Sequence, residues 1–122
     1  MKPLELFKND EEHIDFQAGD IIFSESERGD CMYVIKQGDV EILAGNHVID
    51  TAHEGEIIGE MALIDASERS ATARAKTDCS LIPVDEHRFR FLVQQTPFFS
   101  IYVMRVLVER LRKSNKLLAL TK

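Results

Sequence analysis

The stretch that decides the fold runs from residue 55 to residue 72 and reads GEIIGEMALIDASERSAT. It lies among short β-type runs, yet it breaks the alternation that a strand requires. Residues 61–64 are long enough for one helical turn, and Gly59 before them lets the backbone approach a bound molecule closely. A helical turn inside a β domain needs a reason, and a ligand site is such a reason.

The side chains of this segment suit a single negative phosphate. N–H groups at the start of the turn offer an anion site. Arg69 supplies a bidentate donor that is always charged, and Ser70 adds a hydroxyl. Glu60 only accepts hydrogen bonds when ionised, so beside an anion it needs a donor such as a ribose 2′-hydroxyl. Spacing alone leaves an alternative open, in which Glu60 and Arg69 form an ordinary surface ion pair.

Runs rich in β-branched and aromatic residues flank the segment and predict strands. Glycine-containing turns separate these runs at about the spacing of an all-β sandwich or barrel. A jelly-roll-like β-roll over about residues 14–84 is therefore expected. The expected strands are residues 21–23, 32–35, 40–43, 48–49, 71–75 and 80–84.

After residue 84 the periodicity changes and predicts two helices. Asp85 is the expected N-cap of a short amphipathic helix within residues 85–96, where apolar side chains recur at i, i+3 and i+4. Pro97 then opens a long helix that runs to the end of the chain, over residues 97–122. Spacings of three and four along this helix define a seam of Met104, Leu107, Leu111, Ser114 and Leu118.

The seam suits a partner helix, because alternating spacings of three and four are typical of a coiled coil. Packing of the same stripe on the barrel is the alternative. Since additional valines supply other apolar faces for contact with the barrel, we expect the seam to form a homodimer.

Length and composition predict one domain, residues 1–122, with a single core. No apolar run approaches the roughly 20 residues of a membrane span, and no secretory leader opens the chain, so a cytoplasmic protein without membrane contact is expected. The two cysteines lie far apart and suggest buried, reduced thiols. The net charge of −6 disfavours nucleic-acid binding by this chain alone.

The motif GEMAL at residues 59–63, followed by RSAT at 69–72, closely resembles the phosphate-binding cassette of cyclic-nucleotide-binding domains. The likeness extends upstream through GDIIF at 19–23 and GDCMYVIKQGDV at 29–40, and covers about residues 14–120. It implies a β-roll of the cupin-like double-stranded β-helix type, with a short phosphate-binding helix and a long C-terminal helix. It also implies a regulatory domain that binds a cyclic nucleotide, with cAMP as the expected ligand and cGMP as the alternative, as in catabolite activators and protein kinase A regulatory subunits.

The resemblance implies a role for each cassette residue. Arg69 resembles the ligand of the cyclic phosphate, Glu60 the acceptor of the ribose 2′-hydroxyl, and Ser70 a hydroxyl contact to phosphate. Backbone contacts are implied at three further positions, and Ala71 completes the motif as a binding residue. Those three positions are Gly59, Met61 and Ala62.

The terminal helix resembles that of bacterial catabolite activators, in which a Thr-Ser pair three residues after a leucine meets adenine across the dimer. Here Leu111 precedes Ser114 and Asn115, so asparagine stands in place of the usual serine. Because the sequence ends at Lys122, the helix-turn-helix reader of that class is not expected in this chain. Ser114 and Asn115 are therefore expected ligand residues, and DNA binding by this chain alone is not expected.

Two rival functions remain at this stage. A cupin-type metalloenzyme shares the barrel, but the four histidines include no H-x-H pair, and solvated histidines are the expected interpretation. A ligand-free dimerisation module of the same fold would keep the helical seam, although the intact Glu60 and Arg69 disfavour it. Because no Ser/His/Asp constellation occurs either, a non-catalytic protein is expected.

Overall fold

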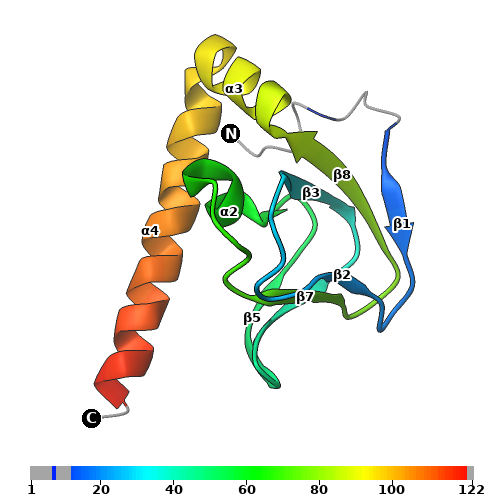
Figure 1. The fold of residues 1–122 in the computed structure, drawn as a ribbon, viewed down its shortest axis with the longest axis vertical. Coiled ribbons are helices and arrows are strands. Elements are labelled where there is room, and N and C mark those ends of the chain that lie inside the picture. The colour runs from blue at the N-terminus through cyan, green and yellow to red at the C-terminus, as the bar shows by residue number, and fades with distance from the viewer. Residues whose placement is uncertain (1–6, 8–11, 121–122) are drawn as a thin grey trace.

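Eight short strands form two antiparallel sheets in the computed structural model, which describes Phe7 and residues 12–120 (Figure 1). One sheet has the strand order β1-β8-β3-β6 and the other the order β2-β7-β4-β5. The two sheets make the predicted jelly-roll-like β-roll. The strands are β1 Ile14–Phe16, β2 Ile21–Phe23, β3 Cys31–Gln37, β4 Val40–Ala44, β5 His47–Ala52, β6 Ile57–Ile58, β7 Thr72–Ala75 and β8 Cys79–Asp85.

Six of these strands coincide with predicted runs, whereas β1 and β6 were not predicted. β1 has three residues, two of them exposed, so it lacks the apolar alternation by which a strand is recognised. β6 has only two residues and lies inside the segment interpreted as a ligand loop. Both pair through backbone hydrogen bonds with long strands, β1 with β8 and β6 with β3, and that pairing depends on tertiary context.

Gly38 allows the tight turn between β3 and β4. Its φ of 97° is in the left-handed region, and a Cβ there would lie 2.8 Å from Cys79 Sγ. The thiol of Cys79 is buried as predicted, and this burial raises its pKa. Cys31 is also a free thiol but is only partly buried, so the prediction of buried thiols is right for one cysteine and half right for the other.

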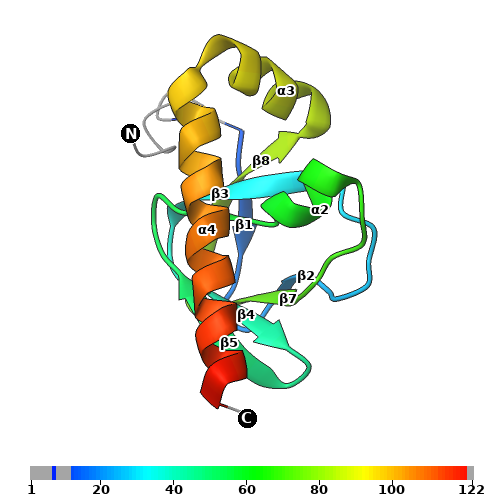
Figure 2. The ribbon, with the colours of Figure 1, turned by 90° about the vertical axis from the view of Figure 1, so that its left-hand side faces the viewer.

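Three helices complete the described fold: α2 Glu60–Asp65, α3 Glu86–Gln95 and α4 Pro97–Leu120. Asp85 caps α3 as predicted, its side chain accepting a 2.8 Å hydrogen bond from the Arg88 amide. The chain turns by 114° between α3 and α4. From that corner α4 runs along one side of the domain, past α2 and on to β5 (Figures 1 and 2).

The two halves of α4 have different environments. Phe99 and Val103 are buried in a cluster shared with α3, β3 and β8, where the rings of Phe89 and Phe99 meet edge to face at 5.7 Å. Beyond Arg110 every described residue of the helix is exposed. The first half thus anchors α4 to the core, and polar contacts hold the second half.

These environments are compatible with the predicted seam at three positions and differ from it at two. Met104, Leu111 and Leu118 are exposed, as a partner helix requires. Leu107 instead packs against the domain's own core, and Ser114 lines a cavity of its own chain. The reason is the period of 3.6 residues, which rotates positions 107 and 114 toward the barrel while the neighbouring positions 108 and 115 face outward.

Within the described residues, no single helix has both the length and the apolarity to cross a membrane; only α3 and α4 taken together, across their 114° bend, pass by composition.

Candidate functional site: a cavity between the β-roll and the last helix

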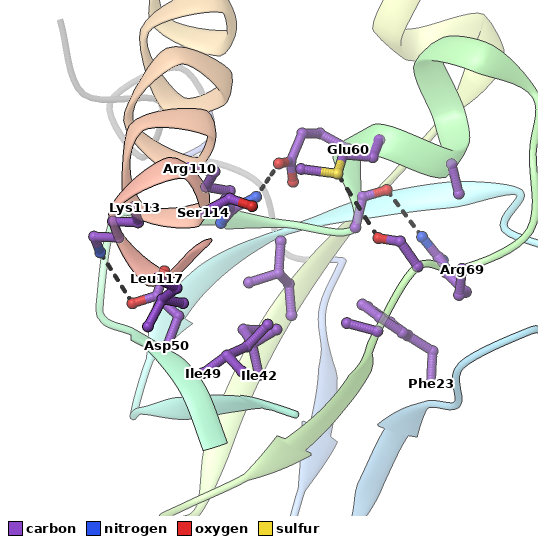
Figure 3. A pocket seen from close by; sticks show the side chains of 16 residues that line it. Phe23, Ile42, Ile49, Asp50, Glu60, Arg69, Arg110, Lys113, Ser114 and Leu117 are labelled. Carbon is purple, nitrogen blue, oxygen red and sulfur yellow. Dashed lines mark hydrogen bonds and ion pairs between the residues drawn. The ribbon is translucent and has the colours of Figure 1, made fainter. Parts of the chain in front are cut away.

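A cavity of about 270 Å³ opens where α2 and the following loop face β4, β5 and α4 (Figure 3). Of the nine predicted ligand residues, eight line it and Asn115 does not. The fold therefore gathers residues 59–62, 69–71 and 114 around one space, although they are up to 55 positions apart in sequence. The eight residues are Gly59, Glu60, Met61, Ala62, Arg69, Ser70, Ala71 and Ser114.

The short helix α2 is bounded by two residues in left-handed backbone conformation. Gly59 precedes it with φ 77°, and Ala66 follows it with φ 55°. These two reversals confine the helix to six residues and return the chain to Arg69. The helical turn predicted from residues 61–64 is thus confirmed, and it is one residue longer at each end.

Arg69 is held almost entirely inside the protein, with 5% of its surface exposed. Its Nη1 donates to the carbonyl oxygen of Gly59 at 2.9 Å, and its Nη2 donates to that of Cys31 at 2.7 Å. A guanidinium has five N–H donors, so within the described residues three have no hydrogen-bond partner. An oriented cation with unused donors at the wall of a cavity is suited to an oxyanion.

Two glycines and an aromatic ring shape the slot that holds this guanidinium. A Cβ at Gly59 would come within 2.6 Å of Arg69 Nη1, and a Cβ at Gly29 within 3.0 Å of its Cζ. The ring of Phe23 lies beneath Arg69, with its centroid 4.1 Å from Cζ. These two positions must therefore be glycine, because a side chain at either one would displace the guanidinium of Arg69. The slot fixes the plane of this guanidinium before any ligand binds.

Glu60 is fully buried, which is unusual for a carboxylate. Its Oε1 accepts a hydrogen bond from Nη1 of Arg110 on α4. Its Oε2 is buried and has no hydrogen-bond partner among the described residues. Because an unsatisfied buried acceptor costs about 1–3 kcal/mol, a hydroxyl or amine donor from a molecule in the cavity would be stabilising there. The sequence alternative of a Glu60–Arg69 pair is wrong, since each residue has a different partner.

Arg110 is the functional-site residue that sequence reasoning missed. Besides Glu60 it holds the carbonyl oxygen of Ile57, to which its Nη2 donates at 2.8 Å. Burial lowers the pKa of Arg110, although arginine stays protonated at neutral pH. A signal was present, because Arg110 lies four residues before Ser114 and so on the same face of the helix.

The second cationic contact of α4 is more exposed. Lys113 Nζ lies 3.1 Å from Oδ1 of Asp50 on β5, with side chains 61% and 27% exposed respectively. Figure 3 places this pair at the opposite side of the cavity from Arg69. Apolar side chains line the space beside the pair: Ile42, Ile49 and Leu117.

The Ser70 hydroxyl has a weaker hydrogen-bond partner than the charged side chains have. This exposed hydroxyl lies 3.7 Å from the sulfur of Met61, a weak acceptor. A phosphate oxygen would compete readily for this hydroxyl.

The histidines form no metal centre: within the described residues no three His, Cys, Asp or Glu side chains come together as ligands. His53 instead pairs with Asp39, Nδ1 to Oδ1 at 2.9 Å, on the surface. This hydrogen bond raises the pKa of His53.

Comparison with known families decides what kind of cavity this is. Residues 13–96 match the model of the cyclic nucleotide-binding domain, which is more than half of the chain. The chain belongs to the cyclic nucleotide-binding domain family. The cyclic-nucleotide-binding resemblance is thus confirmed, and with it the β-roll fold. Cyclic nucleotides are the ligands of this family, whose solved members include complexes with cAMP and with cGMP.

Individual relatives are regulators and regulatory domains. The CRP-like cAMP-activated global transcriptional regulator of Mycobacterium tuberculosis is 29% identical over 111 residues, covering 87% of this chain and 50% of the regulator. The Thermus thermophilus catabolite activator protein is 25% identical with a TM-score of 0.82, over 97% of this chain and 58% of that one. This chain therefore spans about half the length of the curated relatives it matches.

Two further structures carry ligands of the expected class. The cAMP-bound form of the EAL enzyme Bd1971 is 39% identical with a TM-score of 0.66, over 90% of this chain and 30% of the enzyme. The PKAR CBD2 domain bound to Sp-2Cl-cAMPS is 28% identical with a TM-score of 0.76, over 87% of this chain and 70% of that chain. The match to the enzyme is confined to less than a third of its length.

Proposed function

We propose that this domain is a non-catalytic sensor that binds cAMP in preference to cGMP and signals through α4. The observation that carries the proposal is that the same cavity is lined by hydrogen-bond donors on one side chain and by a buried acceptor on another. Arg69 offers three N–H donors for a cyclic phosphate, and the buried Oε2 of Glu60 requires a donor such as the ribose 2′-hydroxyl. A ribose cyclic phosphate supplies both partners in one small molecule.

The remaining cassette residues have smaller roles in this proposal. Ser70 exchanges its weak contact with the Met61 sulfur for a phosphate oxygen. Backbone groups of Gly59, Met61 and Ala62 contact the ribose phosphate, and Ala71 completes the wall. Ser114, whose side chain comes from α4, approaches the base.

Signal transmission follows from what holds α4 in place. The second half of the helix is attached through Arg110 and Lys113, to Glu60 and Asp50 respectively. A ribose bound at Glu60 hydrogen-bonds the same carboxylate that Arg110 contacts. Ligand binding therefore changes the relative free energies of positions of α4 that already exist without the ligand. Cytoplasmic location, and an absence of DNA binding by this chain alone, remain parts of the proposal.

A homodimer through α4 also belongs to the proposal, on a revised stripe. The exposed apolar residues follow spacings of three and four, with β-branched residues at one position and leucine or methionine at the other. Asn115 falls on the same stripe, as single asparagines do in two-stranded parallel coiled coils. The stripe consists of Ile101, Met104, Val108, Leu111, Asn115 and Leu118.

Calorimetric titration of the purified domain with cAMP, cGMP and a cyclic dinucleotide tests this function. We expect saturable binding of the mononucleotides with one site per chain, tighter for cAMP. The rival, a ligand-free dimerisation module, predicts no heat with any of the three. Heat only with the cyclic dinucleotide would also contradict the proposal.

A further inference from the structure

The ring of Phe23 contacts two groups that come from different parts of the fold. Phe23 ends β2 and is 9% exposed. The Cζ of Arg69 lies 4.1 Å from the centroid of this ring, and the ring of Tyr33 is stacked on it, with the centroids 6.4 Å apart and the planes at 16°. The guanidinium and the two rings therefore form one continuous set of contacts, of which Figure 3 shows Phe23 and Arg69.

Tyr33 has a fixed position in the fold although it does not line the ligand cavity. It lies in the middle of β3, which pairs with β8 on one side and with β6 on the other. Its partners in register are Pro83 on β8 and Ile58 on β6, the residue before Gly59. Phe23 lines the cavity and Tyr33 does not. Any effect of Tyr33 on a ligand must therefore pass through neighbouring residues.

The guanidinium of Arg69 is restrained in two different ways. The carbonyl oxygens of Gly59 and Cys31 accept hydrogen bonds at its edge, and these bonds restrain it within its own plane. The ring of Phe23 lies against its face and restrains the tilt of that plane. Ordering a flexible side chain during binding lowers affinity by about two- to tenfold, so a guanidinium that is already oriented binds an anion more tightly.

We propose that Tyr33, through the ring of Phe23, positions the Arg69 guanidinium for the phosphate of the ligand. This inference rests on the proposed function. The stack joins the two sheets, because β3 and β2 belong to different sheets. Burial raises the pKa of Tyr33, so its phenol stays neutral and the residue acts through its ring rather than through a charge. Without that ring Phe23 can move, and the face of the guanidinium loses its support.

The affinity for cAMP, measured by calorimetry, tests this positioning role. Tyr33→Leu should weaken binding by about fivefold, and Phe23→Leu, which removes the ring next to the guanidinium, by about tenfold. Tyr33→Phe keeps the stacked ring, so it should restore the affinity to within about twofold of wild type. Thermal unfolding verifies that each variant is folded. Tyr33→Met, which fills similar space without an aromatic face, replaces Tyr33→Leu if that variant does not fold.

Phe89→Leu is the matched control for the loss of an aromatic ring. Phe89 packs against the core cluster at α3 and does not line the cavity. This variant should lower thermal stability but leave the cAMP affinity within about twofold of wild type. A loss of affinity as large as that of Tyr33→Leu would show that general destabilisation causes both losses, and would overturn the inference.

A second background shows whether the effect passes through the guanidinium. Arg69→Lys keeps the charge but has no plane for a ring to orient. In this background Tyr33→Leu and Phe23→Leu should each weaken binding by less than about twofold, so the losses are not additive. Wild-type affinity in both ring variants, or equal losses in the two backgrounds, overturns the inference, while binding of cAMP by the wild type upholds the proposed function. Failure of the wild type to bind any cyclic nucleotide overturns the proposed function itself.

Discussion

Arg110 on α4 donates a hydrogen bond to Glu60 on α2, and this contact joins segments fifty residues apart at the wall of the cavity. The carboxylate is fully buried and the guanidinium side chain is 21% exposed. The position of the last helix is therefore tied to the carboxylate that we assign to the ribose. Any molecule that hydrogen-bonds Glu60 also acts on the attachment of α4.

The first prediction concerns this attachment. Arg110→Met should lower the free energy of unfolding by about 3 kcal/mol, because it leaves Glu60 as a buried carboxylate without a cation. Urea denaturation of the ligand-free protein measures the change. Arg112→Met, an exposed position on the same helix, is the matched control and should change stability by less than about 0.5 kcal/mol.

A double variant separates the pair from the loss of packing. In Glu60→Gln with Arg110→Met neither side chain of the pair leaves a buried charge behind, so the combined loss should be smaller than the sum of the two single losses. Additive losses would show that Arg110 stabilises the helix through its aliphatic stem alone.

The second prediction concerns Arg69. Arg69→Ala should abolish detectable cAMP binding in calorimetry and also lower stability by about 1–3 kcal/mol, because the carbonyl groups of Gly59 and Cys31 lose their donor. Arg69→Lys keeps a charge but not the planar fork, and should bind at least about tenfold more weakly than wild type. Arg74→Ala, which removes a partly exposed arginine paired with Glu41, controls for net charge. Wild-type affinity in Arg69→Ala would refute the phosphate assignment.

The third prediction is a pH dependence at the surface pair of His53 and Asp39. The hydrogen bond that His53 donates to Asp39 raises the folded-state pKa of His53 above its ordinary value near 6.5. Its contribution to stability is thus fully present below about pH 6.5 and is lost as the pH rises through the folded-state value. Urea midpoints of wild type should fall over that range relative to those of His53→Gln. Parallel pH profiles for the two proteins would contradict this assignment, and high salt should reduce the difference because the pair is exposed.

The sequence was sufficient for the β-roll, because glycine turns and β-branched runs report local preferences directly. The same holds for α3, whose cap is a contact between neighbours, Asp85 and the Arg88 amide. The sequence did not predict β1 and β6. These strands have three and two residues, too few to show a periodicity, and they form because they pair with the longer strands β8 and β3.

In the site, the cassette motif identified Glu60 and Arg69 but not the groups with which they form hydrogen bonds in the structure. The cation of Glu60 comes from α4 and the acceptors of Arg69 are backbone carbonyls, neither of which leaves a mark in the cassette sequence. Likewise, the seam prediction included Leu107 because spacing identifies an apolar stripe without saying which of two adjacent stripes the core covers. Tertiary packing decides these points.

The fourth prediction is that the outer stripe of α4 forms the dimer. Leu111 is 62% exposed at the centre of this stripe, so Leu111→Lys should place two like charges in the seam and shift the domain to monomer in sedimentation velocity. Leu120→Lys makes the same chemical change at a residue that is 81% exposed but lies off the stripe, and should leave the association unchanged.

Ligand and dimer should also be coupled, because α4 carries both the stripe and the cavity residues Arg110 and Ser114. By linkage, cAMP must tighten the dimer by the same factor by which dimerisation tightens cAMP. Ser114→Ala should weaken cAMP by roughly the 0.5–1.5 kcal/mol of a neutral hydrogen bond and leave the ligand-free dimer intact. Sedimentation of each variant with and without cAMP tests both halves. A wild-type chain that stays monomeric at high concentration and still binds cAMP would exclude the dimer and its coupling. Any signal carried by α4 would then act within a single chain.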